Sequence, residues 1–97
     1  MSSEFHLRRQ MSCTRGELMS WLPGATRGAL IEIVGNRGTI TIDGGSVEIS
    51  FEEKMPRRVG AIALPTLDVC FRFHGLDELA RENFLQYFDL YTRRGGG

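Results

Sequence analysis

Residues 67–74 alternate strictly between apolar and polar side chains, and no other segment restricts the fold as much. Neighbouring side chains of a strand point to opposite faces of a sheet, so this pattern predicts a strand with one buried and one exposed face. The apolar face carries Leu67, Val69, Phe71 and Phe73, and the polar face carries Asp68, Cys70, Arg72 and His74. A strand of this kind is typical of an antiparallel sheet that is covered on one side.

Other segments with apolar alternation or short apolar runs predict further strands at 4–10, 29–34, 39–42, 47–52 and 59–64. Asn36-Arg37-Gly38 and Asp43-Gly44-Gly45 contain residues that tolerate positive φ, so we expect turns there. Residues 55–58 are expected to form a connection. Pro65 is expected at a bend or a sheet edge, because proline cannot donate to a central ladder.

Two helices are predicted. Thr14 followed by Glu17 matches a capping box, and Pro23-Gly24 is expected to end the first helix. Asp77-Glu78 favours the start of a second helix, where carboxylates complement the positive end of the helix dipole. The apolar half of this helix is predicted to hold Leu76, Leu79, Ala80, Phe84, Tyr87, Phe88, Leu90 and Tyr91, with Leu85 pointing the opposite way.

These elements predict an α+β fold in a single two-layer domain over residues 1–94. The sheet is expected to be mostly antiparallel, with about five strands and two helices on one face, in the approximate order β-α-β-β-β-β-β-α. A chain of 97 residues leaves no room for a second domain. Residues 95–97 are glycines and are predicted to form a flexible tail. The open sheet face is expected to carry Thr39, Thr41, Glu48, Ser50, Glu52, Asp68, Cys70, Arg72 and His74.

The charges of the chain balance, with 12 Lys and Arg against 12 Asp and Glu. A neutral domain has no general field that attracts a polyanion, so nucleic acid is not favoured as a partner. No apolar run approaches the roughly 20 residues that a membrane span needs. The N-terminal residues lack the apolar core of a signal peptide, and we therefore expect a cytoplasmic protein.

The sequence favours a role without catalysis, and it indicates no catalytic residue, no metal ligand set and no cofactor. It holds neither a GxSxG elbow nor a phosphate-binding glycine motif. Cys70 and His74 share a strand face, but four residues of a strand span about 13 Å, too far for one metal ion. A thiol or metal enzyme that uses Cys70 is the weakest alternative.

Arginines occur in three adjacent pairs, Arg8-Arg9, Arg57-Arg58 and Arg93-Arg94. Guanidinium groups that converge from different elements can hold a phosphate or carboxylate by paired hydrogen bonds. Pairing with surface carboxylates is the competing interpretation. The candidate binding residues are Arg57, Arg58, Arg72, His74, Arg93 and Arg94.

The stretch IALPTLDVCFRFHG at 62–75, together with the ending FDLYTRRGGG at 88–97, resembles a family of small uncharacterised bacterial proteins. This resemblance covers about a quarter of the chain. It implies a bacterial cytoplasmic protein and brings no activity, cofactor or catalytic residue with it.

The leading functional hypothesis is a protein-interaction module. Its contact surface is either the open sheet face or the aromatic end of the C-terminal helix with Arg93-Arg94, and its partner is another protein or a second copy of the chain. The alternative is a protein that binds a small anion or a nucleotide phosphate through the arginine pairs.

Overall fold

Seven elements of secondary structure follow one another in the computed structural model, which describes residues 5–42 and 44–93. They are β1 (Phe5–Met11), α1 (Arg15–Ala25), β2 (Leu30–Val34), β3 (Arg37–Ile42), β4 (Gly45–Val59), β5 (Ile62–His74) and α2 (Glu78–Arg93). The tail expected at residues 95–97 lies outside the described residues, and so do Glu4, Asp43 and Arg94.

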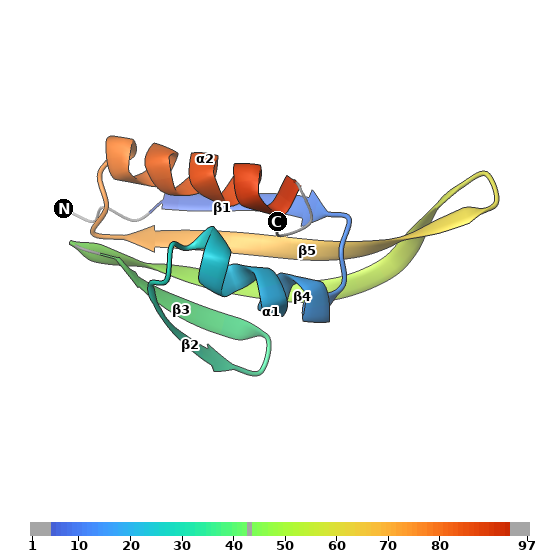
Figure 1. Ribbon diagram of the computed structural model, residues 1–97, viewed down its shortest axis with the longest axis horizontal. Helices are drawn as coiled ribbons and strands as arrows, with labels where there is room; N and C mark the ends of the chain where they lie inside the picture. The colour runs from blue at the N-terminus through green and yellow to red at the C-terminus, as the bar shows by residue number, and fades with distance from the viewer. Residues whose placement is uncertain (1–4, 43, 94–97) are drawn as a thin grey trace.

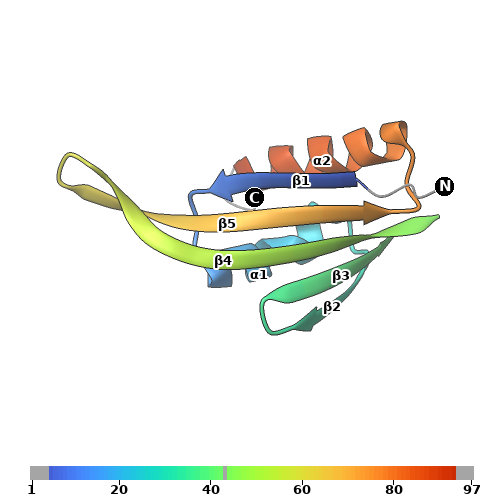
Figure 2. The same cartoon turned by 180° about the vertical axis from the view of Figure 1, so that it is seen from behind.

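All five strands form one antiparallel sheet in the order β1-β5-β4-β3-β2. Both helices lie on the same side of this sheet (Figure 1). The reverse view looks onto the uncovered side, with the strands in front and the helices behind them (Figure 2). The predicted α+β class, the antiparallel sheet and the two helices on one face are confirmed.

The core lies between the apolar face of β5 and the two helices. Leu67, Val69, Phe71 and Phe73 are all fully buried, as the alternation predicts. The Phe71 ring meets the Phe88 ring of α2 edge to face, with 5.2 Å between the ring centroids. It also contacts Phe84 at 6.4 Å in the same manner. These contacts fix which face of the sheet α2 covers.

The capping box at the start of α1 is confirmed. The Glu17 N–H donates to the Thr14 hydroxyl oxygen at 3.1 Å, and the Thr14 N–H donates to the Glu17 carboxylate at 2.8 Å. The expected end at Pro23-Gly24 is wrong, since the helix continues to Ala25. Pro23 lies in the last turn, and there it removes a single N–H donor from the helix. At Gly24 the missing side chain leaves room for the Tyr91 ring of α2.

The buried stripe of α2 differs from the predicted one. Leu79 and Leu90 are 66% and 45% exposed, whereas Leu85 packs against the core. At 100° per residue, Leu79 and Leu90 lie about 160–180° from the buried Phe88, and Leu85 lies only about 60° away. The stripe is therefore centred on Phe84 and Phe88 and is narrower than the predicted half of the helix.

The turn between β2 and β3 consists of Gly35 and Asn36, not of Asn36-Arg37-Gly38. Gly35 has a φ of 62°, and Arg37 already pairs with Val34. Gly38 is a strand residue, and a Cβ at this position would come within 2.6 Å of the Ile33 side chain. Its small size serves packing within the sheet.

The largest departure from the sequence-based expectation is the length of the β4–β5 hairpin. Residues 55–58, expected as a connection, belong to β4, and the predicted strand at 59–64 is split between the end of β4 and the start of β5. Backbone pairing between the two strands continues through this segment, from Lys54 and Thr66 to Val59 and Ile62. A register shift interrupts it between Lys54 and Arg57.

This hairpin extends past the rest of the sheet. β3 pairs with β4 only as far as Ser50, and β1 pairs with β5 only from Leu67 onward. Residues 54–66, which we call the arm, therefore form a two-stranded ribbon without a third strand or a helix over them (Figure 1). Pro65 lies at an edge of this ribbon, in keeping with its expected position. The arm accounts for the elongated dimensions of 48 × 27 × 25 Å.

The burial of Phe71 and the exposure of Arg72 predict a large difference between two neighbouring substitutions. Phe71→Ala is expected to lower the free energy of unfolding by about 3–5 kcal/mol, because it leaves a cavity under α2. Arg72→Ala removes only a half-exposed ion pair and is expected to cost less than about 1 kcal/mol. Urea unfolding followed by circular dichroism measures both, and equal losses would contradict the assigned faces of β5.

Candidate functional site

The uncovered face of the sheet carries the polar side chains that the alternation predicts. Across β4 and β5, Glu48 pairs with Arg72, Ser50 with Cys70 and Glu52 with Asp68. From β3, Thr39 lies opposite Glu48 and Thr41 lies opposite Ser46. The predicted polar residues thus lie together on the open sheet face.

Two of the candidate binding residues, Arg72 and His74, come together at one carboxylate. The Arg72 guanidinium lies 3.8 Å from the Glu48 carboxylate, and the His74 imidazole lies 3.3 Å from the same oxygen. All three side chains are between one third and one half exposed, so these are solvent-screened contacts. Glu48 therefore occupies the position in which an anionic ligand would have to meet Arg72 and His74.

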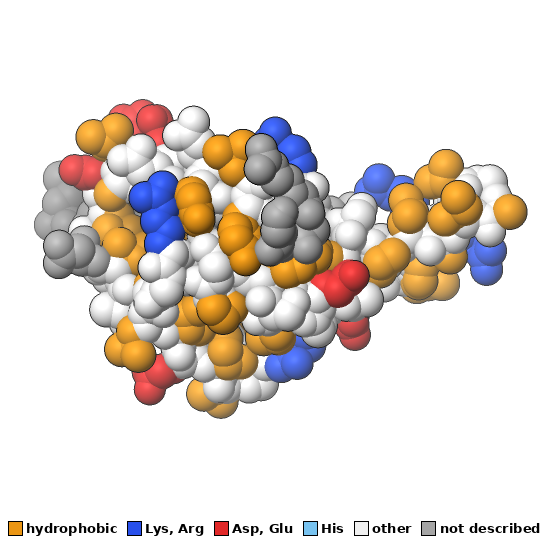
Figure 3. Space-filling view, in the orientation of Figure 1, with side chains coloured by type: hydrophobic (Ala, Val, Ile, Leu, Met, Phe, Trp, Pro, Cys, Tyr) orange, Lys and Arg blue, Asp and Glu red, His pale blue; other side chains and the backbone are white. Residues whose placement is uncertain are grey.

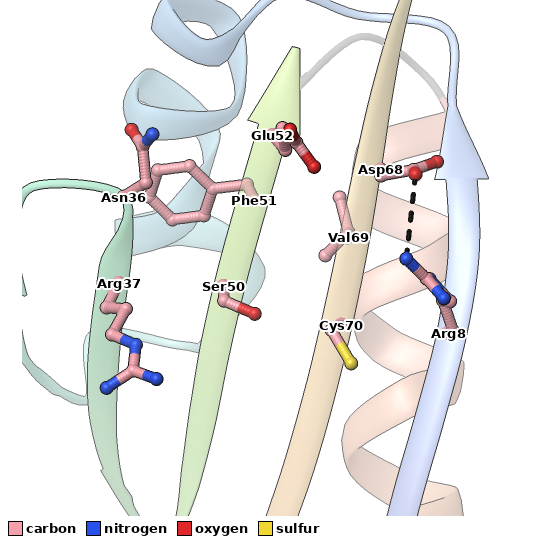
Figure 4. A pocket seen from close by; sticks show the side chains of 9 residues that line it. All are labelled: Arg8, Asn36, Arg37, Ser50, Phe51, Glu52, Asp68, Val69 and Cys70. Carbon is pink, nitrogen blue, oxygen red and sulfur yellow. Dashed lines mark ion pairs between the residues drawn. The ribbon is translucent and has the colours of Figure 1, made fainter. Parts of the chain in front are cut away.

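A shallow hollow of about 340 Å³ lies on the same face (Figure 4). Arg8 of β1 and Arg37 of β3 stand on either side of it, with Ser50 and Cys70 between them. Asp68 and Glu52 also line the hollow, and the Arg8 guanidinium lies 3.9 Å from the Asp68 carboxylate. The two arginines are balanced by the two carboxylates, so the hollow does not concentrate positive charge.

Neither Arg8 nor Arg37 was among the candidate residues, although both line this hollow. The sequence could have indicated Arg8, because Leu7 lies on the apolar face of a predicted strand and the next residue therefore lies on its polar face. What was missing was the register, which places Arg8 opposite Cys70 and Arg37 opposite Ser50. Register between distant strands is set by packing and is not encoded locally.

The arginine pairs are distributed over separate parts of the molecule. Arg8 and Arg9 point to opposite faces, and Arg9 pairs with Asp89 of α2 on the helix side. Arg57 and Arg58 lie on the arm, opposite Leu64 and Ala63. Leu64 and Arg72 are eight residues apart in β5, which corresponds to about 26 Å. Arg93 ends α2 and lines a hollow with Arg9 and Trp21 on the helix side.

The two cysteines occupy different environments. Cys13 is 1% exposed, and burial, with a smaller contribution from Glu17, raises the pKa of its thiol to about 11. Cys70 is partly exposed at the hollow. Within residues 5–42 and 44–93, no three His, Cys, Asp or Glu side chains are grouped so that they could hold a metal ion.

The arm combines exposed apolar side chains with positive charge. Met55 is 88% exposed, Val59 56% and Ile62 62%. Apolar and basic side chains gather along it in the space-filling view (Figure 3). Residues 54–66 contain Lys54, Arg57 and Arg58 and no acidic residue. Arg57 and Arg58, two of the candidate binding residues, stand on this projecting ribbon, which the sequence pattern does not predict.

Contacts at the base connect the arm to the open sheet face. The Lys54 ammonium lies 3.1 Å from the Glu52 carboxylate and 3.9 Å from that of Asp68. The Arg57 guanidinium donates to the Gln10 side-chain oxygen of β1 at 3.1 Å. Arg58, Val59 and Ile62 lie farther out, toward the turn at Gly60. These outer residues are the part of the arm that lies farthest from the core.

No family model matches the chain, and comparison with curated proteins and with solved structures finds no significant similarity. None of the helices in the described part of the chain is long and apolar enough to span a bilayer.

The two thiols are expected to differ in reactivity. At pH 8 a disulfide reagent such as dithiobis(nitrobenzoate) should react rapidly with the partly exposed Cys70 and with Cys13 only after unfolding, because Cys13 is buried and the pKa of its thiol is raised. Cys70→Ser should remove the fast phase, which stopped-flow absorbance measures. A fast phase that persists in Cys70→Ser would contradict the burial of Cys13.

The raised pKa of Cys13 also sets the direction of a pH effect on stability. The folded state holds this proton more tightly than the unfolded state, in which the usual pKa is 9.0. The contribution of the protonated Cys13 thiol to the free energy of unfolding is therefore fully present below about pH 9, and it is lost as the pH rises toward 11. Compared with Cys13→Ala, the free energy of unfolding of the natural chain should fall more steeply over this range in urea titrations.

Proposed function

We propose that the chain is a non-enzymatic protein-interaction module of the cytoplasm, and that the arm is the element that binds a protein partner. The observation that carries this proposal is the exposure of Met55, Val59 and Ile62 on a ribbon with no core of its own. A hairpin of two strands is at best marginally stable in water. Contact with a partner would bury these side chains and order the ribbon.

The charges of the arm indicate the chemistry of that partner. The whole chain has 12 basic and 12 acidic residues, and the arm has three basic and none acidic, so the remainder has three more acidic than basic residues. A partner surface with an apolar groove bordered by carboxylates complements both features of the arm. A long polyanion is less well matched, because the body of the molecule would repel it.

The small-anion alternative has less support. It requires guanidinium groups that converge, whereas Arg57 and Arg58 lie on the arm and Arg72 lies beside Glu48. The weakest alternative is thiol chemistry at Cys70, and among the described residues that line the hollow there is no histidine to activate the thiol.

Site-specific photocrosslinking tests the proposal. A benzoylphenylalanine placed at Ile62 is expected to give a discrete adduct with one protein in the cells from which the chain derives. Leu79 on α2 is the matched control position, since it is 66% exposed and Ile62 is 62% exposed. Arg58→Glu should reduce the adduct at Ile62 by about tenfold or more, and Arg58→Lys should largely retain it.

The fold is expected to tolerate these arm variants, with a change in unfolding free energy within about 0.5 kcal/mol, because the altered side chains are exposed. Equal adducts at Ile62 and Leu79, or no adduct at Ile62, would contradict the proposal. So would binding of the purified chain to phosphatidylglycerol vesicles or to duplex DNA that Arg58→Glu abolishes, since the arm would then recognise a lipid surface or a nucleic acid.

A further inference from the structure

The two edges of the sheet differ in how they are protected against pairing with another strand. β1 forms one edge and contains the charged neighbours Arg8 and Arg9. β2 forms the other edge, with the sequence LIEIV and a single charge at Glu32. Both views show β2 as the outermost strand on its side of the sheet (Figures 1 and 2). Charged side chains and prolines are the usual protection of an edge, and β2 has only its short length and one carboxylate.

Apolar side chains stand on both faces of β2. Ile31 and Ile33 lie on the helix side, opposite Ile40 and Gly38 of β3. On the open face, Leu30 is 68% exposed and Val34 is 80% exposed, and Ile33 is 39% exposed on the other side. Strands with apolar residues on both faces are typical of sheets that are covered on both sides. β2 therefore has the composition of a buried strand at the position of an exposed edge strand.

The sequence of β2 is also nearly the same in both directions. A two-fold axis normal to the sheet at Glu32 would place β2 antiparallel to the β2 of a second copy. Leu30 would then lie opposite Val34 and Ile31 opposite Ile33, so that every apolar residue faces an apolar one. In either neighbouring register, displaced by two residues, Glu32 would face Leu30 or Val34, and the pairing would run into the glycines at 28 or 35.

The charges near the axis balance as well. Glu32 would face Glu32 of the second copy, and like charges directly opposite are unfavourable. Arg37 lies on the same face, one diagonal from Glu32, because Thr39 is the residue opposite Glu32. The open face near the axis would hold the two Glu32 carboxylates and, one diagonal farther out on each side, the two Arg37 guanidinium groups, which together carry no net charge. The two carboxylates limit the affinity, and the two guanidinium groups keep the interface neutral.

We propose that the outer edge of β2 binds the β2 of a second copy of this chain, in a two-fold dimer whose sheet continues across the interface. The backbone N–H and C=O groups on the outer side of each strand supply the hydrogen bonds. A pair of five-residue strands is a small contact, so the dimer belongs to the weak, transient class. The same axis points the two arms in opposite directions and leaves both free.

Disulfide trapping in a Cys70→Ser background tests the register. Glu32→Cys should form a covalent dimer under mild oxidation with copper phenanthroline, since the two side chains face each other across the axis. Leu30→Cys alone and Val34→Cys alone should not, but a mixture of the two should. Equal trapping in all three single variants would indicate random collision and overturn the proposal.

Sedimentation equilibrium of the natural chain at protein concentrations up to about 1 mM provides the second test. Ile33→Lys places a charge at the centre of the interface and is expected to weaken the dimer by at least about tenfold. Val59→Lys, on the arm, is the control and should leave the association unchanged. Glu32→Gln should tighten it by about two- to fivefold, because it removes the facing carboxylates.

A natural chain that is monomeric throughout this range, or a Glu32→Gln variant that dimerises more weakly, would overturn the proposal. Circular dichroism shows whether Ile33→Lys is folded. If this variant is unfolded, Glu32→Gln still tests the proposal. The outcome is independent of the arm, because Ile62→Ser and Arg58→Glu should not alter sedimentation. Failure of the dimer and failure of the arm as a binding element are thus separate results.

Discussion

The packing of Phe71 against Phe84 and Phe88 is the contact from which the rest of the arrangement follows. It joins the centre of the sheet to α2 and decides which face of β5 is buried. Because side chains alternate along a strand, burying Phe71 and Phe73 forces Cys70, Arg72 and His74 onto the other face. The neighbouring strands inherit this division through their register with β5.

The arm follows from the same hairpin that forms the core. β4 and β5 are held together by backbone hydrogen bonds, which need no helix above them, so the ladder can continue beyond Phe51 and Leu67 where burial ends. Side chains past that point have no core to enter. Met55, Val59 and Ile62 therefore remain exposed on this ribbon, and our proposal that the arm binds a partner rests on their exposure.

The open sheet face is a weaker candidate surface than its size suggests. Its cations lie close to carboxylates, as with Arg8 and Asp68 or Arg72 and Glu48. Paired charges of this kind keep the sheet face hydrated, and they give it little attraction for an anion. The unbalanced features of the molecule lie elsewhere, in the positive and apolar arm and in the apolar edge at β2. We propose a different occupant for each of these surfaces.

Local patterns in the sequence determined the class of fold and the two faces of β5. The alternation at 67–74, the capping box at Thr14 and the acidic start of α2 act over a few residues, and each is found where it was predicted. The width of the stripe that α2 buries and the end of α1 depended on the position of neighbouring elements, and for Leu79, Leu85, Leu90 and the helix end the prediction was wrong. Only the tertiary structure decided that 54–66 projects as a ribbon, that Arg8 and Arg37 flank Cys70, and that β2 lies at an edge. Strand order and register are long-range properties, because they are set by which apolar faces pack together and not by the residues of any one strand.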